Sequence, residues 1–186
     1  MSLDEICFEA EEKMEKAVGF LGGELRGIRT GRATTGLVEH IKVDYYGSST
    51  PLQQLASLAI PEANLIVIKP FDPSSIKDIE RAILASELGI TPQSDKRVIR
   101  LTVPPLSGER RKQLANRVKQ MAEQDRISIR NIRREANKHI DQEQKDKKAS
   151  EDEAAKGKDE IQELTRKHEE KVGELLKGKL AEIENS

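Results

Sequence analysis

The chain has 186 residues, which is enough for one elaborated domain or two small ones. Aromatic residues make up only 3% of it and Trp is absent, so its core must be built from Leu, Ile, Val, Met and Ala, which suits long helices packed side by side. One Cys and three scattered His exclude an intrachain disulfide and a cysteine-rich metal site.

Basic and acidic residues are unevenly distributed, although the formal net charge is only −1. Residues 97–138 contain twelve Lys or Arg and four Asp or Glu, a balance of about +8, and acids predominate from residue 141 onward. This polarity is compatible with a polyanionic partner on one side of the molecule. The N-terminus lacks a signal-peptide core and no apolar run approaches the ~18–20 residues that span a bilayer, so we expect a cytoplasmic protein.

The first predicted element is a long helix. Ser2 and Glu5 have the spacing of a capping box, and apolar residues then keep to one face as far as about Arg29. Cys7 lies on this face and is expected to be a core thiol. Four glycines interrupt the pattern, and each lowers helix stability by about 1 kcal/mol relative to Ala, so tertiary packing must stabilise the helix. Gly31 is placed as its C-terminal cap.

A small α/β module follows. Alternating or apolar runs predict strands at 40–46, 65–69 and 98–103, and residues 52–59 form only a short apolar stretch. The segment from Asp72 opens a short helix that Gly89 ends. Residues 31–104 therefore form an inserted domain, joined to the rest by two short links.

Two long helices complete the chain. Ser107 caps a central helix that continues to about residue 148, and Ser150 with Glu153 forms a second capping box before the last helix. Three long helices with single apolar faces predict a three-helix bundle of residues 1–30 and 105–186. The links near 30–33 and 103–106 are candidate hinges, with Thr30, Gly31, Arg32, Pro104 and Pro105 as the hinge residues.

The central helix has two unlike faces at about 100° per residue. Its apolar stripe consists of Leu114, Val118, Met121, Ile129, Ile132 and Ala136. The adjacent basic face consists of Lys112, Lys119, Arg126, Arg130, Arg133 and, at its margin, Arg134. Glu123 is the main acid close enough to neutralise this face.

The basic face permits two interpretations. It is either a solvated outer surface or a binding site for phosphate groups, to which the planar fork of Arg is suited. The helix has no aromatic platform for unstacked bases, so folded RNA recognised by shape fits better than a DNA sequence. Arg26, Arg29 and Arg32 at the end of the first helix extend the same patch.

Little in the sequence indicates an enzyme. The histidines lie far apart, the glycines follow no strand as a phosphate loop requires, and the α/β module offers no nucleophile–base pair for a hydrolase. We expect no catalytic residue, no metal and no cofactor. The alternative to an RNA-binding function is a helical adaptor whose bundle binds another protein and whose basic face is merely solvated.

Seven segments carry a family resemblance. They are, in order, 29–33 (RTGRA), 43–47 (VDYYG), 50–56 (TPLQQLA), 82–89 (AILASELG), 104–106 (PPL), 109–112 (ERRK) and 129–134 (IRNIRR). As an ordered set they closely resemble the ribosome recycling factor family, over essentially the whole chain. The resemblance implies a two-domain α+β protein, L-shaped and tRNA-like in outline, in which the bundle is the long arm and a small β/α/β sandwich-like domain is the short arm.

The resemblance also implies a function. The family acts with elongation factor G, and with GTP hydrolysis by that factor, to split the post-termination ribosome into subunits, and it is not itself an enzyme. Its bundle lies on large-subunit rRNA. The expected partners are thus the ribosome and elongation factor G, with no membrane and no DNA, and the protein is expected to be a monomer.

The rRNA-binding residues follow from both arguments. The basic bundle residues of the family match Arg29, Arg32, Arg110, Arg111, Arg130 and Arg133. Arg126 and Arg134 are added from the basic face alone.

Overall fold

The computed structural model describes residues 1–186 and divides into two compact units. The bundle unit comprises residues 1–25 and 113–181, and the sheet unit comprises residues 26–112 and 182–186. The predicted two-domain α+β class is confirmed. The predicted boundaries at 30/31 and 104/105 remain a prediction, because the ends of all three long helices group with the sheet unit.

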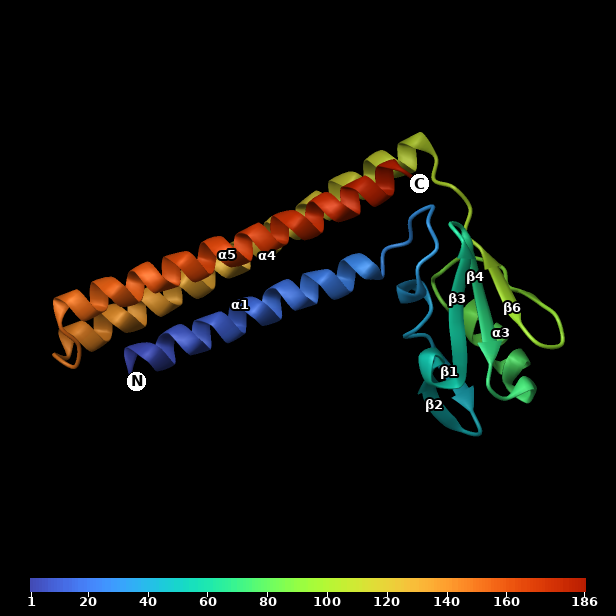
Figure 1. Cartoon of the computed structure of the whole chain (residues 1–186), viewed down its shortest axis with the longest axis horizontal. Helices are drawn as coiled ribbons and strands as arrows, with labels where there is room; N and C mark the ends of the chain where they lie inside the picture. Colours follow the sequence, from blue (N-terminus) through green and yellow to red (C-terminus); the bar gives the residue numbers. More distant parts are fainter. The chain divides into compact units, whose positions relative to one another are not determined.

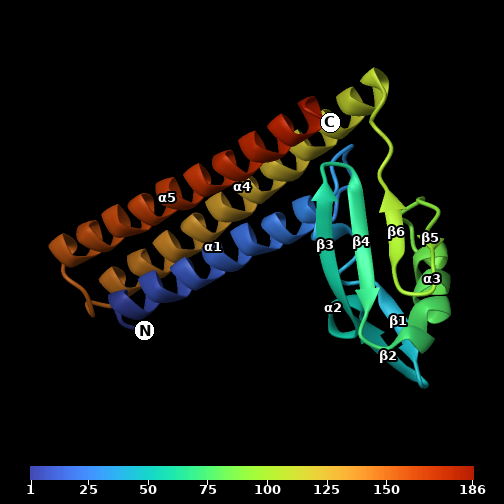
Figure 2. The same ribbon diagram turned by 45° about the vertical axis from the view of Figure 1, so that its right-hand side comes forward.

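The bundle unit is made of three long helices that lie side by side (Figures 1 and 2). They are α1 (Leu3–Arg26), α4 (Gly108–Lys145) and α5 (Glu151–Glu184). The first predicted capping box is present, because the Ser2 N–H donates to Glu5 Oε2 at 2.8 Å and the Glu5 N–H donates to Ser2 Oγ at 3.2 Å. None of the helices is both long and apolar enough to cross a membrane.

The other two helices also begin as predicted. Ser107 Oγ accepts the Arg110 N–H at 3.2 Å at the start of α4. Ser150 and Glu153 exchange backbone-to-side-chain bonds of 2.8 and 3.3 Å at the start of α5. Each pair satisfies helix N–H groups that have no partner within the helix, so three local signals fix where the bundle helices start.

Apolar side chains from all three helices form the bundle core. Four residues of the predicted stripe of α4 are buried and the other two, Met121 and Ile132, are half-buried, which confirms that the stripe faces the core. One cluster joins Ile6, Cys7, Ala10, Ala136, Ile140, Ala154 and Ile161. Cys7 is 4% exposed and burial raises its pKa to about 11, as expected of a core thiol.

The sheet unit contains two antiparallel sheets. A hairpin joins β1 (Lys42–Tyr45) to β2 (Ser48–Pro51) through Tyr46 and Gly47, both of which have positive φ. The larger sheet has the strand order β3-β4-β6-β5. Its strands are β3 (Ala56–Glu62), β4 (Leu65–Pro70), β5 (Gln93–Ser94) and β6 (Ile99–Thr102). The helical elements are η1 (Thr35–Leu37), α2 (Leu52–Leu55), η2 (Pro73–Ser75) and α3 (Ile76–Ala85).

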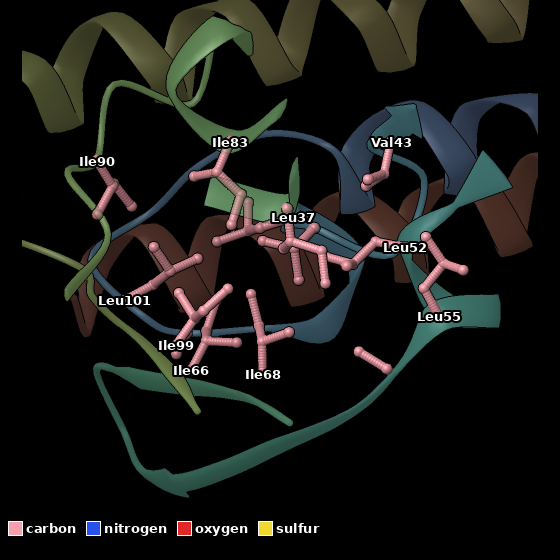
Figure 3. Packing of buried hydrophobic residues seen from close by; sticks show 14 of the residues in the cluster. Leu37, Val43, Leu52, Leu55, Ile66, Ile68, Ile83, Ile90, Ile99 and Leu101 are labelled. Atoms are coloured by element: carbon pink, nitrogen blue, oxygen red, sulfur yellow. The ribbon is translucent and has the colours of Figure 1, made fainter. Parts of the chain in front are cut away.

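The core of the sheet unit lies on one face of the larger sheet. Ile66 pairs with Leu101 and Ile68 with Ile99 across β4 and β6, and all four side chains are fully buried. Figure 3 shows them gathered with Leu37 and Ile83 in one cluster. Alternation along β4 and β6 therefore produces the core, as the period of two in the sequence predicts.

One segment of this unit had no predicted secondary structure, and one sequence expectation is wrong. Residues 52–59, described as a short apolar stretch, form α2 and most of β3. β3 is an edge strand whose register shifts between Ala59 and Glu62, and this irregularity accommodates Pro61. Gly89 does not end the short helix, since α3 stops at Ala85 and Gly89 lies in the irregular segment after it, with φ +68°.

Gly31 is also not a helix cap. α1 ends at Arg26, and Gly31 is instead needed for a close approach within the sheet unit. A Cβ at this position would lie 2.6 Å from Ser186 Cβ and 3.3 Å from Pro105 Cα. Glycine is required here by packing, not by backbone conformation.

We predict that Gly31→Ala lowers the free energy of unfolding by about 1–3 kcal/mol, because the added methyl group must displace Ser186 or Pro105. The matched control is Gly178→Ala, in the exposed interior of α5 with no atom within 4 Å of the new Cβ. It should raise the stability by about 0.5–1 kcal/mol through helix propensity. Urea unfolding followed by circular dichroism measures both, and equal effects of the two substitutions would contradict the close approach.

Asp125 is a buried acid in α4. It is 8% exposed, and its Oδ2 has no hydrogen-bond partner. Burial, and secondarily the negative charge of Glu24, raises its pKa from 3.8 to about 6. The carboxyl group of Asp125 therefore binds a proton more tightly in the folded state than in the unfolded state. Protonation of Asp125 stabilises the folded state below pH 4, and this stabilisation is lost as the pH rises to about 6.

We therefore predict that Asp125→Asn raises the free energy of unfolding by about 1–3 kcal/mol at pH 7.5 and by little at pH 4. Asp159→Asn, at an exposed position of α5, should stay within about 0.5 kcal/mol of wild type at both pH values. Urea unfolding at the two pH values measures the difference. An increase in the free energy of unfolding that was the same at both pH values would contradict the raised pKa of Asp125.

Candidate nucleic-acid interface

The predicted basic face of α4 is present in the bundle unit, but its cations are not equivalent. Arg126, Arg130 and Arg133 are half-buried, whereas Lys119 and Arg134 are exposed. The apolar stripe holds α4 against α1 and α5, so the cations at its side project along the outer surface of the helix. What distinguishes them is the set of partners that each one has.

Arg130 is held by two carboxylates. Its Nε donates to Glu169 Oε1 of α5 at 2.9 Å, and its Nη1 donates to Glu123 Oε1 at 3.2 Å. The hydrogen bond with Glu169 raises the pKa of Arg130 above its usual range. Arg126 lies 3.7 Å from Glu123 Oε2. Two of the predicted site residues are therefore partly neutralised inside the protein.

Arg133 and Arg134 have no carboxylate partner. Arg133 Nη1 donates to a neutral partner, Gln162 Oε1 of α5, at 3.4 Å. Arg134 makes no hydrogen bond or ion pair through its side chain. Both guanidinium groups can accept an anion without first breaking an ion pair.

The predicted site residues of the sheet unit have mixed roles. Arg29 Nη1 donates to the Leu88 carbonyl oxygen at 3.3 Å, and Arg111 Nη2 donates to the Ser186 carbonyl oxygen. The Nε atom of each is buried without a partner. These two arginines thus serve the packing of the unit, whereas Arg32 and Arg110 are exposed.

Two of the predicted hinge residues, Thr30 and Gly31, lie beside the C-terminal end of the chain within the sheet unit. Thr30 is 1% exposed, and its hydroxyl donates to Glu182 Oε1 at 2.7 Å and accepts the Arg32 N–H at 3.3 Å. Gly31 packs against Pro105 and Ser186, as described above. Pro104 and Pro105 are exposed and lie in the irregular segment between β6 and α4.

The sequence analysis did not predict the side chains of α5 that pair with the arginines of the basic face. Glu169 is 39 residues from Arg130, and only the antiparallel packing of α4 and α5 brings the two together. Gln162 was missed for the same reason. The amphipathic pattern located the face, but no local signal gives the register between two helices.

Comparison with known proteins identifies the family. The family model described as ribosome recycling factor matches residues 21–183. A ribosome-recycling factor of Desulfosudis oleivorans is 49% identical over 181 residues, which cover 97% of this chain and 98% of that protein. One from Rhodopirellula baltica is 60% identical over 138 residues, or 74% of each chain.

Solved structures agree with these relatives. A solution structure of a ribosome recycling factor superimposes with a TM-score of 0.84 at 41% identity, covering 100% of this chain and 99% of the other. A second match has a TM-score of 0.72 at 39% identity over 98% and 99% of the two chains. It belongs to models of the T. thermophilus ribosome recycling factor and the E. coli elongation factor G bound to the E. coli post-termination complex.

The residues matched by the family model include α4, nearly all of α5, the strands of the sheet unit and the end of α1, so they extend into both units of the structure. Members of this family are translation factors and not enzymes, in agreement with the sequence-based expectation. The chain belongs to the ribosome recycling factor family.

Proposed function

We propose that this protein acts in the cytoplasm with elongation factor G to dissociate the post-termination ribosome into subunits, anchored on large-subunit rRNA through the basic face of α4. The observation that carries the proposal is the match to a recycling factor, over 98% of this chain, that occurs together with elongation factor G on a post-termination complex. At 39% identity this match supports a shared mode of action as well as a shared fold.

The surface of α4 supports an RNA partner. Arg126, Arg130, Arg133 and Arg134 lie within nine residues of one helix, and Arg forms bidentate contacts with phosphate. No Phe, Tyr or Trp occurs in α4, so the face has no platform on which unpaired bases stack. A basic rod without aromatic residues contacts the backbone of folded RNA and does not read its bases.

The two links between the predicted domains support a hinge. Residues 27–34 and 103–107 contain no helix or strand, so each link can rotate without breaking regular structure. Thr30 is fixed to Glu182 of α5, so rotation on that side begins beyond Thr30. In this mechanism elongation factor G pushes the sheet domain, and the bundle transmits the force to the contacts between the ribosomal subunits.

We predict that Arg133→Ala weakens binding to vacant ribosomes by roughly tenfold at low salt and reduces the slope of log affinity against log salt by about 1, because one phosphate contact is lost. Co-sedimentation across a KCl series measures both quantities. The control is Lys16→Ala on α1, a 72%-exposed cation paired with Glu12, which should leave binding unchanged. Affinity of Arg133→Ala equal to wild type at every salt concentration would remove this face from the interface.

The hinge predicts that binding and splitting can be separated. In a Cys7→Ala background, Thr34→Cys and Leu106→Cys place one thiol on each link for cross-linking by a bifunctional maleimide. The cross-linked protein should bind ribosomes normally but split them poorly, as measured by sucrose-gradient sedimentation with elongation factor G and GTP. The same variant before cross-linking is the control, and undiminished splitting after cross-linking would rule out domain rotation as a requirement.

A further inference from the structure

A pocket lies at one end of the bundle unit, where the N-terminus lies beside the turn that joins α4 to α5 (Figures 1 and 2). It has a volume of about 480 Å³, within the range of small-ligand sites. The beginnings of α1 and α5 and the end of α4 form its walls. No residue of the basic face lines the pocket, so an inference about it goes beyond the recycling function and does not depend on it.

The floor of the pocket is small and apolar. Leu3, Cys7, Ala149 and Gly157 line it, and Cys7 and Gly157 are buried. The Cys7 thiol donates to the Gly157 carbonyl oxygen at 3.9 Å. Because burial, followed by the negative charge of Glu160, raises the pKa of Cys7 to about 11, the thiol stays protonated at neutral pH. The floor therefore offers apolar contact and not a reactive group.

Charged side chains of both signs surround this floor. Two acids and two cations have no ion-pair partner within the protein, and all four are exposed; they are Asp4, Lys148, Lys156 and Glu160. The other two acids of the lining are already engaged. The Met1 ammonium group lies 3.3 Å from Glu143 Oε1, and Glu153 Oε2 accepts the Ser150 N–H at 2.8 Å. The pocket thus presents two available charges of each sign.

The available charges are spread along the pocket. Lys148 lies in the turn before α5, and Glu160 is the last residue of α5 that lines the pocket. The lining residues of α5 begin at Glu153, so the wall extends over about 10 Å at 1.5 Å per residue. An extended peptide rises about 3.3 Å per residue, so about three residues match this length.

We propose that this pocket binds a short peptide with free termini, whose carboxylate contacts Lys148 and Lys156 and whose ammonium group contacts Asp4 and Glu160. The apolar floor contacts the side chains between the two charged ends.

Ligands of a single charge fit the pocket less well. A polyamine would be repelled by the two lysines, and a polyanion by the two acids. A metal ion lacks a site, because no three His, Cys, Asp or Glu side chains are placed to hold one. The terminus of a longer protein chain would bring only one of the two charges, so it can use only half of the available partners.

The first test titrates the isotope-labelled full chain with the tripeptide alanyl-leucyl-alanine and follows the backbone amide signals by NMR. The signals of Cys7 and Gly157 should shift and saturate, with a dissociation constant of roughly 0.1–1 mM. The N-acetylated and the C-terminally amidated tripeptides each lack one terminal charge and should bind roughly tenfold or more weakly.

Two results of this titration would overturn the proposal. One is the absence of a saturable shift at about 10 mM tripeptide. The other is equal affinity for the free and the capped tripeptides, which would show that the terminal charges are not recognised.

The second test compares two double variants that both keep the net charge of wild type. Asp4→Asn/Lys156→Ala removes one charge of each sign from the pocket, and Glu15→Gln/Lys16→Ala removes the same charges from α1 outside it. All four residues are exposed, so both variants should fold, and circular dichroism verifies this. The pocket variant should bind the tripeptide roughly tenfold or more weakly than wild type, and the control should bind it equally well. Equal affinity of the two variants would contradict the assignment of the pocket.

Discussion

The packing of α4 through its single apolar stripe is the constraint on which the rest of the molecule depends. Val118, Ile129 and Ala136 face the other two helices, and this contact fixes the rotation of α4 about its own axis. Once that rotation is fixed, the cations beside the stripe must lie on the surface, and α5 lies next to them. The same packing buries Asp125, and the free-energy cost of burying its unpaired oxygen offsets part of the stabilisation from the apolar stripe.

The neighbouring helix then determines which cations remain available. Glu169 of α5 reaches Arg130, and Glu123 of α4 reaches both Arg126 and Arg130, whereas Arg133 meets only Gln162. A phosphate that binds Arg130 must compete with a carboxylate at 2.9 Å, but one that binds Arg133 need not. The electrostatic properties of the face thus depend on the pairing of α4 with α5 as much as on the sequence of α4.

Much of the fold could be predicted because its signals are local. The capping boxes at Ser2 and Ser150 and the alternation along β4 and β6 each lie within a few residues of the feature that they specify. β2, β3 and β5 were not predicted, because short or irregular strands are stabilised by partners elsewhere in the chain and carry little alternation of their own. Gly31 shows the same limit, since its role depends on Ser186 at the far end of the chain.

The candidate site was predictable to the same extent. The face of α4 follows from helical periodicity, but the burial of Arg29 and Arg111 and the pairing of Arg130 are tertiary facts. Counting charge along a sequence treats these arginines as equal, whereas the structure separates those that hold the protein together from those that can bind a partner.

The most direct test of the recycling function is the dissociation of purified post-termination ribosomes, followed by light scattering. We expect this protein, elongation factor G and GTP together to convert intact ribosomes to subunits, and omission of any one of the three to leave the scattering unchanged. Ribosomes that stay intact in the presence of all three, while the protein is bound to them, would contradict it.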